Sequence, residues 1–317
     1  MARVVVLGSS GFDLTVRLPR LPRPGETLLG GELRTGPGGK GANQAIAARR
    51  AGAEVTFLTA SGDDDFGRRA RENDRAEGID LTYAKVVPGV ANQVALIFVD
   101  ADGQNVIGVA PGASAHLTPA DIDRLPEAVF APGAVFLASL EVPLETVVRG
   151  LERARAAGMF TVLNPAPADH ALIRGEILPL VDVLTPNQEE ALALTGLILD
   201  DPLEAVGAAR DLQINYGARV VVVTRGAEGC LVVTPEEVIQ VQPHQVEAVD
   251  TVGAGDAFNG ALAVALAEGR SLVEAAAWAN AAGALAVTRP GAQGALPRRP
   301  AIDRLAALAS GPPRPLE

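Results

Sequence analysis

Lysine and cysteine are almost absent from this chain of 317 residues. Lys40 and Lys85 are the only lysines, so arginine carries nearly all of the positive charge. Cys230 is the single cysteine, which excludes an intrachain disulfide and fits a reducing compartment. No apolar run approaches the roughly 20 residues of a membrane span, and the first residues have too short an apolar run, and no cleavage site, for a signal peptide. We therefore expect a cytoplasmic protein with no membrane partner.

Aromatic residues and positive charge are also scarce. Aromatic residues make up 3% of the chain and hydrophobic residues 48%, so aliphatic side chains must fill the core. Asp and Glu number 38 against 27 Lys and Arg, which gives a formal net charge of −11. An acidic surface repels the phosphate backbone of nucleic acids. We therefore expect no nucleic-acid partner.

Short β-branched runs alternate with Ala-rich amphipathic stretches along the chain. This alternation is typical of βα units around a mostly parallel sheet, and it predicts a single α/β domain over residues 1–317 with helices flanking the sheet. The predicted strands are Arg3–Gly8, Val55–Ala60, Ala134–Ala138, Phe160–Leu163, Val181–Leu184 and Arg219–Thr224. The predicted helices are Ala42–Ala51, Asp256–Glu268, Leu272–Val287 and Ala301–Ala309.

Two early stretches do not follow this alternation of strands and helices. Glu26–Leu33 and Ile79–Val109 are typical of antiparallel strands joined by turns, and the alternation in Gln93–Val99 indicates a sheet with one open face. We interpret them as a small β-sheet lid formed by residues 14–35 and 79–110. Ordinary edge strands of the main sheet are the alternative.

The segment Gly36–Gln44 (GPGGKGANQ) places four glycines before a predicted helix. Glycines let backbone amides approach a ligand, and the helix N-terminus adds partial positive charge. The spacing is not that of a P-loop, because Ala42 follows Gly41. A glycine turn with a purely structural role is the alternative, but one of only two lysines lies within this loop. The segment therefore favours a ligand site.

The segment Asp250–Gly260 (DTVGAGDAFNG) follows a strand-like stretch, Gln245–Val249, and opens a helix. Gly253 and Gly255 free the backbone so that successive N–H groups can converge on an anion. Asp256 then lies beside this anion hole, where its productive role is to accept a proton from an attacking hydroxyl. The alternative is that Asp256 only caps the helix.

Together, the two segments resemble the two signatures of the PfkB carbohydrate kinases, and they are most similar to those of ribokinases. The likeness covers nearly the whole chain. Other similar stretches are Pro24–Thr27, Val94–Val99, Asn105–Gly108, Leu163–Pro167 and Thr185–Asn187. The resemblance implies a ribokinase-like fold and transfer of the γ-phosphoryl group of ATP to a sugar hydroxyl.

The resemblance also implies the roles of individual residues. Asp256 matches the catalytic base, with Gly253, Ala254 and Gly255 forming the anion hole. The positions that match substrate contacts are Asp13, Gly39, Lys40, Gly41, Asn43, Glu141 and Asp256. The positions that match nucleotide contacts are Asn187, Thr224, Arg225, Gly226, Gly229, Gly255 and Asn280. Glu190 matches the residue that organises Mg²⁺ through water, together with Asn187. A monovalent cation, K⁺ in the first instance, is implied at Asp250 and the carbonyls of Val252, Val287, Pro290 and Ala292.

One departure from the family pattern bears on the substrate. Ribokinases carry Asn two residues before the position of Asp13, whereas this chain has Gly11 followed by Phe12. The first expected reaction is phosphorylation of D-ribose to D-ribose 5-phosphate. A nucleoside, or a bulkier sugar that fills the space of the missing Asn, is the alternative substrate.

Two alternatives lie outside kinase activity. An inactive sugar-binding sensor could retain the fold. A Rossmann dehydrogenase is suggested by Gly8–Gly11, which lacks the required glycine spacing. We also expect a homodimer through the lid, because Val94, Leu96 and Phe98 lie on one side of its open face.

Overall fold

The computed structural model describes residues 1–101, 104–175, 177–197, 201–308 and 313–315. Within these residues the largest sheet has nine strands. Their order across the sheet is β15 (Arg314–Pro315), β14 (Val238–Val241), β13 (Cys230–Val233), β12 (Val220–Thr224), β11 (Val183–Leu184), β10 (Phe160–Asn164), β9 (Val135–Ser139), β1 (Arg3–Leu7) and β4 (Glu54–Leu58). The strands from β12 to β4 are parallel, and β13 to β15 pair in antiparallel fashion.

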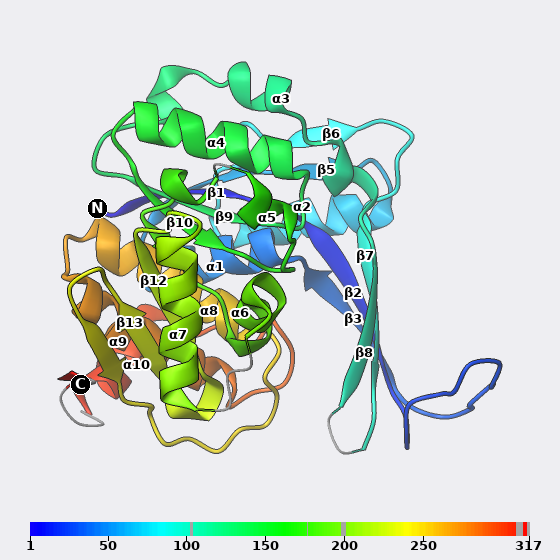
Figure 1. Cartoon of the computed structure of the whole chain (residues 1–317). Coiled ribbons are helices and arrows are strands. Elements are labelled where there is room, and N and C mark those ends of the chain that lie inside the picture. Colours follow the sequence, from blue (N-terminus) through cyan, green and yellow to red (C-terminus); the bar gives the residue numbers. More distant parts are fainter. Residues whose placement is uncertain (102–103, 176, 198–200, 309–312, 316–317) are drawn as a thin grey trace.

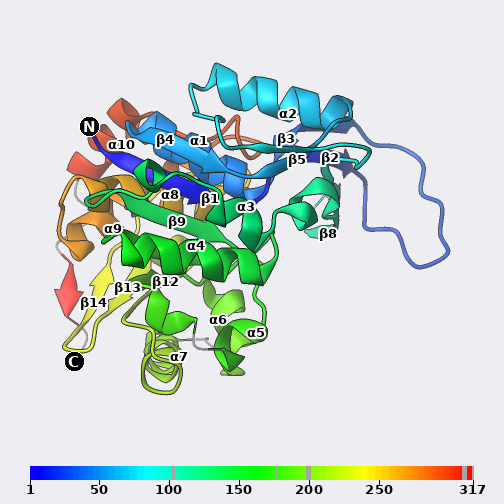
Figure 2. The same cartoon turned by 90° about the horizontal axis from the view of Figure 1, so that it is seen from above.

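Helices cover both faces of this sheet, as Figures 1 and 2 show for α1 and α4. The first core contains side chains of α1 (Lys40–Ala51), α8 (Ala254–Ala267), α9 (Leu272–Ala286) and α10 (Arg299–Ala307). The second contains side chains of α3 (Pro119–Asp123), α4 (Leu144–Ala156), α5 (Ala171–Arg174), α6 (Gln188–Thr195) and α7 (Pro202–Ile214). Val4 and Val6 of β1 join the first core, whereas Val5 and Leu7 join the second. Because both faces are buried, the strands are continuous β-branched runs.

Most of the strands and helices predicted from the sequence are confirmed to within a few residues. The prediction of a strand-like stretch at Gln245–Val249 was wrong, because these residues form irregular backbone. This stretch runs directly into the turn before α8 and pairs with no strand of the main sheet. No helix in the described parts of the chain is both long and apolar enough to cross a membrane.

A separate four-stranded sheet, referred to as the lid, extends away from the main body (Figure 1). Its order is β3 (Leu33–Gly38), β2 (Gly11–Arg17), β7 (Gln93–Val99) and β8 (Asn105–Ala110). Residues 26–32 are not a strand, so the predicted strand Glu26–Leu33 was wrong. The central pair, β2 and β7, is parallel rather than antiparallel. Residues 102–103, in the predicted lid segment, lie outside the described residues.

The strand register gives the two faces of the lid different residues, and both faces carry apolar side chains. Asp13, Thr15 and Arg34 line a cleft between the lid and the main body. The strand register places apolar residues on the opposite face: Leu14, Val16, Leu33, Leu96, Phe98 and Val106. Leu33, Leu96 and Val106 are 62%, 50% and 55% exposed. The outer face of the lid is therefore an exposed apolar surface.

Shorter elements complete the chain. They are β5 (Ala60–Gly62), which pairs with β6 (Lys85–Val87), the helix α2 (Asp65–Ala76), and the 3-10 turns Gly112–His116, Glu127–Val129, Leu178–Leu180 and Gly226–Glu228.

Candidate active site

Asp256 lies in the first turn of α8, which begins at Ala254 after the left-handed Gly253 (φ +80°). Its carboxylate is buried, and both oxygens accept hydrogen bonds from α1. Asn43 Nδ2 donates to Oδ2 at 2.9 Å, and Gln44 Nε2 donates to Oδ1 at 3.0 Å. The Asp256 carboxylate is thus held by side chains of another helix, and no hydrogen bond within the described residues joins it to the backbone at the start of α8.

Glycines bring these elements close together. A Cβ at Gly260 of α8 would lie 2.5 Å from Ala47 Cβ of α1. A Cβ at Gly41 would lie 2.5 Å from the carbonyl carbon of Gly8, which follows β1. Gly39, at the start of α1, has φ +90°, a conformation that side-chain-bearing residues rarely adopt. The N-terminus of α1 therefore packs closely against the end of β1, and the middle of α1 packs closely against α8.

The charges around Asp256 are strongly coupled. Burial raises the pKa of Asp256, whereas Lys40 and the amides of Asn43 and Gln44 lower it in part. Burial lowers the pKa of Lys40, but the carboxylates around it, Asp256 and Glu141 foremost, raise it above its ordinary value. A carboxylate with a raised pKa accepts a proton more readily near neutral pH. Asp256 is therefore suited to general-base chemistry, beside a lysine that stays protonated.

The first turn of α8 carries donors for an anion. Ala254 N donates to Thr251 O at 3.3 Å, and in the described part of the chain the N–H of Gly255 has no backbone acceptor. Unpaired N–H groups and the helix dipole together favour a negative ligand at a helix N-terminus. The start of α8 is therefore a candidate anion hole directly beside the Asp256 carboxylate.

Glu141 follows β9 and connects three segments of the chain. Its Oε2 accepts hydrogen bonds from Lys40 N at 3.0 Å, from Gln93 Nε2 at 3.1 Å and from Ser9 Oγ. Within the described residues its Oε1 has no partner, so that oxygen remains available to accept from a ligand hydroxyl.

Asp13 lies on β2, directly over the glycine-rich segment. A Cβ at Gly38 would lie 2.3 Å from the Asp13 carboxylate, so only glycine leaves room for it. Burial, followed by Glu141 and Asp256, raises the pKa of Asp13 to about 6, against a lowering effect of Lys40. Asp13 therefore belongs to the same electrostatic group as Asp256.

Asn187 and Glu190 form a capping box at the start of α6. Glu190 N donates to Asn187 Oδ1 at 2.7 Å, and Asn187 N donates to Glu190 Oε2 at 2.9 Å. An isolated bridge pairs Asn187 with Thr224 at the end of β12. Burial raises the pKa of Glu190, the backbone hydrogen bond from Asn187 and the charge of Lys40 lower it in part, and Asp256 has a smaller raising effect. Glu190 therefore caps α6 and also interacts electrostatically with Lys40 and Asp256.

The loop after β12 carries a buried arginine. Arg225 N donates to Gly229 O at 2.8 Å, and the Arg225 guanidinium pairs with Glu228 at 2.6 Å. Gly226 and Gly229 have φ of +52° and +82°, which glycine adopts readily. The Arg225 guanidinium nitrogens are buried and make no hydrogen bond within the described residues, at the carboxyl end of the parallel strands, where ligands bind in open α/β sheets.

Asn280 lies apart from the charged group, on α9. Its Nδ2 donates to Gln242 O at 2.8 Å, just after β14. No interaction among the described residues connects Asn280 to Asp256 or to Lys40.

Asp250 joins by hydrogen bonds the two loops that the family resemblance assigns to a monovalent cation. Its Oδ1 accepts from Val252 N at 3.1 Å and its Oδ2 from Gly291 N at 2.8 Å. The Val287 carbonyl already accepts from Val249 N at 2.7 Å and from Asp250 N at 3.2 Å. Of the five assigned ligands, Val287 therefore has the least capacity left for a cation.

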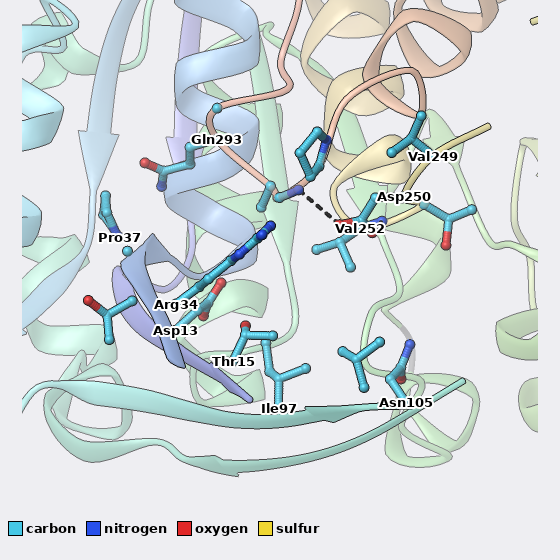
Figure 3. Close-up of a pocket in the computed structure, with 18 of the residues that line it drawn as sticks. Asp13, Thr15, Arg34, Pro37, Ile97, Asn105, Val249, Asp250, Val252 and Gln293 are labelled. Carbon is cyan, nitrogen blue, oxygen red and sulfur yellow. Dashed lines mark hydrogen bonds between the residues drawn. The ribbon is translucent and has the colours of Figure 1, made fainter. Parts of the chain in front are cut away.

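A cleft of about 600 Å³ separates the lid from these loops. Figure 3 shows Thr15 and Arg34 of the lid facing the loops that carry Asp250 and Val252. Pro290 and Ala292 also line the cleft, whereas Val287 and Asp256 do not. Asp13 lies in the cleft and interacts electrostatically with Asp256, so the cleft leads to the charged group.

The sequence analysis did not single out four polar residues of the site: Ser9, Gln44, Gln93 and Asn164. Gln44 donates to both Asp256 and Asn164 Oδ1, the latter at 3.0 Å. Gln44 and Asn164 stand inside motifs quoted for the family, which is the signal that could have found them. Ser9 and Gln93 become visible only through their contacts with Glu141.

Residues 1–299 match the model of the pfkB family of carbohydrate kinases. A ribokinase of Haemophilus influenzae is 39% identical over 296 residues, which cover 93% of this chain and 95% of the relative. A deoxyribokinase of Salmonella typhimurium is 37% identical over 294 residues, which cover 93% and 95%.

Solved structures agree with these relatives. A ribokinase of Arabidopsis thaliana in complex with ribose and ATP aligns with a TM-score of 0.83 at 29% identity, covering 96% of this chain and 99% of that one. These matches confirm the resemblance read from the two signatures and the ribokinase-like fold. The chain therefore belongs to the pfkB family of carbohydrate kinases, and it is a phosphotransferase that acts on an alcohol group.

Proposed function

We propose that this enzyme transfers the γ-phosphoryl group of ATP to the primary hydroxyl of D-ribose, giving D-ribose 5-phosphate. The observation that carries the proposal is the Asp256 carboxylate, buried and held by Asn43 and Gln44 beside the free N–H groups of α8. A base and an anion hole side by side are what transfer of a phosphoryl group to an alcohol requires. The ribokinase relatives support the choice of sugar.

In this mechanism Asp256 accepts the proton of the attacking hydroxyl, and its raised pKa suits that task. The N–H groups at the start of α8 stabilise negative charge on the transferred group. Glu141 and Asp13 accept hydrogen bonds from the sugar hydroxyls. Lys40 lies among the carboxylates of the site and balances their charge. Catalysis then rests on positioning and electrostatic stabilisation, because phosphoryl transfer asks for little covalent chemistry from the protein.

The nucleotide would lie along the loop after β12, with Asn187, Thr224, Arg225 and Gly226 near its phosphates and Asn280 near its base. Glu190 is the carboxylate that fits Mg²⁺, since Mg²⁺ keeps most of its waters and needs few protein carboxylates. When bound, Mg²⁺ would neutralise charge on the phosphates. The interaction of Glu190 with Lys40 and Asp256 supports this placement.

A monovalent cation would fit at Asp250 and the nearby carbonyls of Val252, Pro290 and Ala292. One carboxylate with several carbonyl oxygens suits a large, weakly hydrated ion such as K⁺. When bound, the ion would add positive charge beside the loops that precede α8. The hydrogen bonds from Val252 and Gly291 to Asp250 support a preformed loop pair.

A homodimer through the lid is part of the proposal. The outer face of the lid exposes Leu33, Leu96 and Val106, which a second copy would cover. A deoxyribose kinase is the second candidate function, supported by the deoxyribokinase relative.

One experiment separates these functions. ADP release should be measured with D-ribose, 2-deoxy-D-ribose and a set of nucleosides, and the product position should be assigned by phosphorus NMR. The proposal expects the highest kcat/KM with D-ribose and a 5-phosphate product. Turnover that is restricted to nucleosides would overturn it, and no turnover with any alcohol would support a sugar-binding sensor.

A further inference from the structure

Gln93 borders the space that Gly11 leaves open. The two residues are direct partners in the parallel register of β2 and β7. A Cβ at Gly11 would lie 3.4 Å from both Cγ and Nε2 of Gln93, at ordinary van der Waals contact. The Gln93 amide therefore borders the position that a side chain of residue 11 would take. Gly11 is in extended backbone, so glycine is not required by its conformation.

The Gln93 amide is directed at the sugar side of the site. It is 2% exposed, and its Nε2 donates to Glu141 Oε2 at 3.1 Å. The same Oε2 accepts from Lys40 N, at the first residue of α1. Gln93 thus holds one oxygen of Glu141 and leaves the other for a ligand. Because Glu141 follows a strand of the main sheet and Gln93 begins a lid strand, this bond also joins the lid to the body.

The other end of the amide has no partner. Gln93 Oε1 is buried and accepts no hydrogen bond from the described residues. A buried amide with a purely structural role normally satisfies both ends, and an unpaired one calls for an explanation. The free oxygen and the bond to Glu141 both point to a role connected with the ligand.

We propose that Gln93 is a positioning residue of the sugar site, which fixes Glu141 and supplies the side-chain amide that Gly11 lacks. Sugar specificity is then set by the pair of residues 11 and 93, rather than by residue 11 alone. This inference rests on the proposed phosphorylation of a sugar. Because the amide acts through Glu141, its loss weakens sugar binding and leaves ATP binding intact.

The test is a double-mutant cycle between these positions. Gln93→Leu keeps the size of the side chain and removes its polar groups. We expect it to raise KM for D-ribose about 10- to 100-fold, the range for losing a hydrogen bond to a charged group, with KM for ATP within a factor of about two. The kcat/KM ratio between D-ribose and 2-deoxy-D-ribose should also shift, which a general loss of packing would not produce.

Restoring the amide from the other position distinguishes a positioning role from a packing role. Gly11→Asn alone should not tighten binding, because the new side chain would meet Gln93. Gln93→Ala alone should raise log KM for D-ribose. Adding Gly11→Asn to Gln93→Ala should reverse at least half of that rise. Gln240→Leu on β14, the same substitution in a strand toward the opposite end of the main sheet from β1, serves as the control and should leave KM for D-ribose unchanged.

Calorimetric titration of each folded variant with D-ribose reports binding without turnover. An unchanged KM and Kd for D-ribose in Gln93→Leu, or an equal rise in KM for ATP and sugar, would overturn the role of Gln93. If the wild-type enzyme phosphorylates a different alcohol, the proposed ribose function fails, and the same cycle measured on that alcohol still decides the role of Gln93.

Discussion

Asn43 donates its side-chain amide to Asp256 Oδ2 across 2.9 Å, although 213 positions separate the two residues in the chain. This bond joins the glycine-rich segment at the start of α1 to the segment that opens α8. Gln44, the next residue of α1, binds the other oxygen of the same carboxylate. The two sequence signatures are therefore halves of one site.

Asp256→Asn should remove the base while the fold remains. The introduced amide group would face a donor, but Asn43 can rotate its own amide because its Oδ1 has no partner among the described residues. General bases contribute roughly 10²- to 10⁴-fold in rate. We expect kcat to fall by about that factor, with sugar KM nearly unchanged, as measured by coupled ADP release.

Asn43→Ala is the matched comparison, since it removes a partner of the base but not the base. It should reduce kcat far less than Asp256→Asn does. A value of kcat for Asp256→Asn within a few-fold of wild type would contradict the assignment of the base.

Activity should fall on the acid side of neutrality. The pKa values of Asp13 and Asp256 are raised, that of Asp13 to about 6, so both carboxylates take up protons at higher pH than an ordinary aspartate does. The protonated forms can neither accept a hydroxyl proton nor bind the sugar as carboxylates. We expect kcat/KM for the sugar to decline as the pH drops through about 6.

A pH profile of kcat/KM for wild type and Asp13→Asn checks this assignment. In the variant the decline should move to lower pH, because loss of the negative charge of Asp13 lowers the pKa of the carboxylates that remain. Identical profiles would show that Asp13 does not contribute to the acid limb.

Potassium should raise the activity. After dialysis against a tetraalkylammonium salt, titration with KCl at constant ionic strength should restore turnover in wild type. Asp250→Asn should respond weakly or not at all, because it removes the only carboxylate among the proposed ligands. A flat response in wild type would contradict the proposed site.

The lid should mediate dimerisation. Leu96→Asp places a charge in the apolar outer face, and burial of an unpaired charge strongly disfavours an interface. We expect light scattering to report a dimer for wild type and a monomer for Leu96→Asp. Leu203→Asp, at a leucine that is 66% exposed on α7, should leave the mass unchanged. A wild-type monomer at all concentrations would contradict the dimer.

Asp74 makes stability depend on pH. Its carboxylate is 1% exposed, and burial raises its pKa to about 7 from an ordinary value of 3.8. Because the folded state binds the proton more tightly than the unfolded state, this group costs stability as the pH rises from about 4 through 7. Asp74→Asn should therefore stabilise the protein at about pH 8, by on the order of 1–4 kcal/mol, and should have little effect at about pH 4.

Calorimetric melting at the two pH values measures this difference. An equal shift in Tm at both values would show that the substitution acts through packing rather than through charge.

Much of the main fold follows from the sequence alone. The strands of the parallel sheet are β-branched runs that are buried on both faces, as with Val4, Val5 and Val6, and such runs are distinctive. The glycine-rich segments are also easy to identify, because closely spaced glycines before a helix have few roles other than a tight turn or a ligand site. Asp256 could be proposed as the base because it follows directly on such a segment.

The lid was harder to predict. Its central strands, β2 and β7, pair in parallel across a large separation in the chain, which local alternation does not reveal. Residues 26–32 contain apolar positions but form no strand. A role for Gln93 was not predicted for a related reason: it depends on two partners, Gly11 and Glu141, that are distant in sequence.

Gly260 carries a further consequence. Its missing side chain lets α8 lie against α1 near Ala47, and that closeness lets Asn43 and Gln44 reach the carboxylate of Asp256. Gly260 does not bind the Asp256 carboxylate itself, but its small size allows Asn43 and Gln44 to bind it. Random mutagenesis scored by activity alone would rank Gly260 with the catalytic machinery, and only a measurement of helix spacing or of folding would reveal it as a spacer.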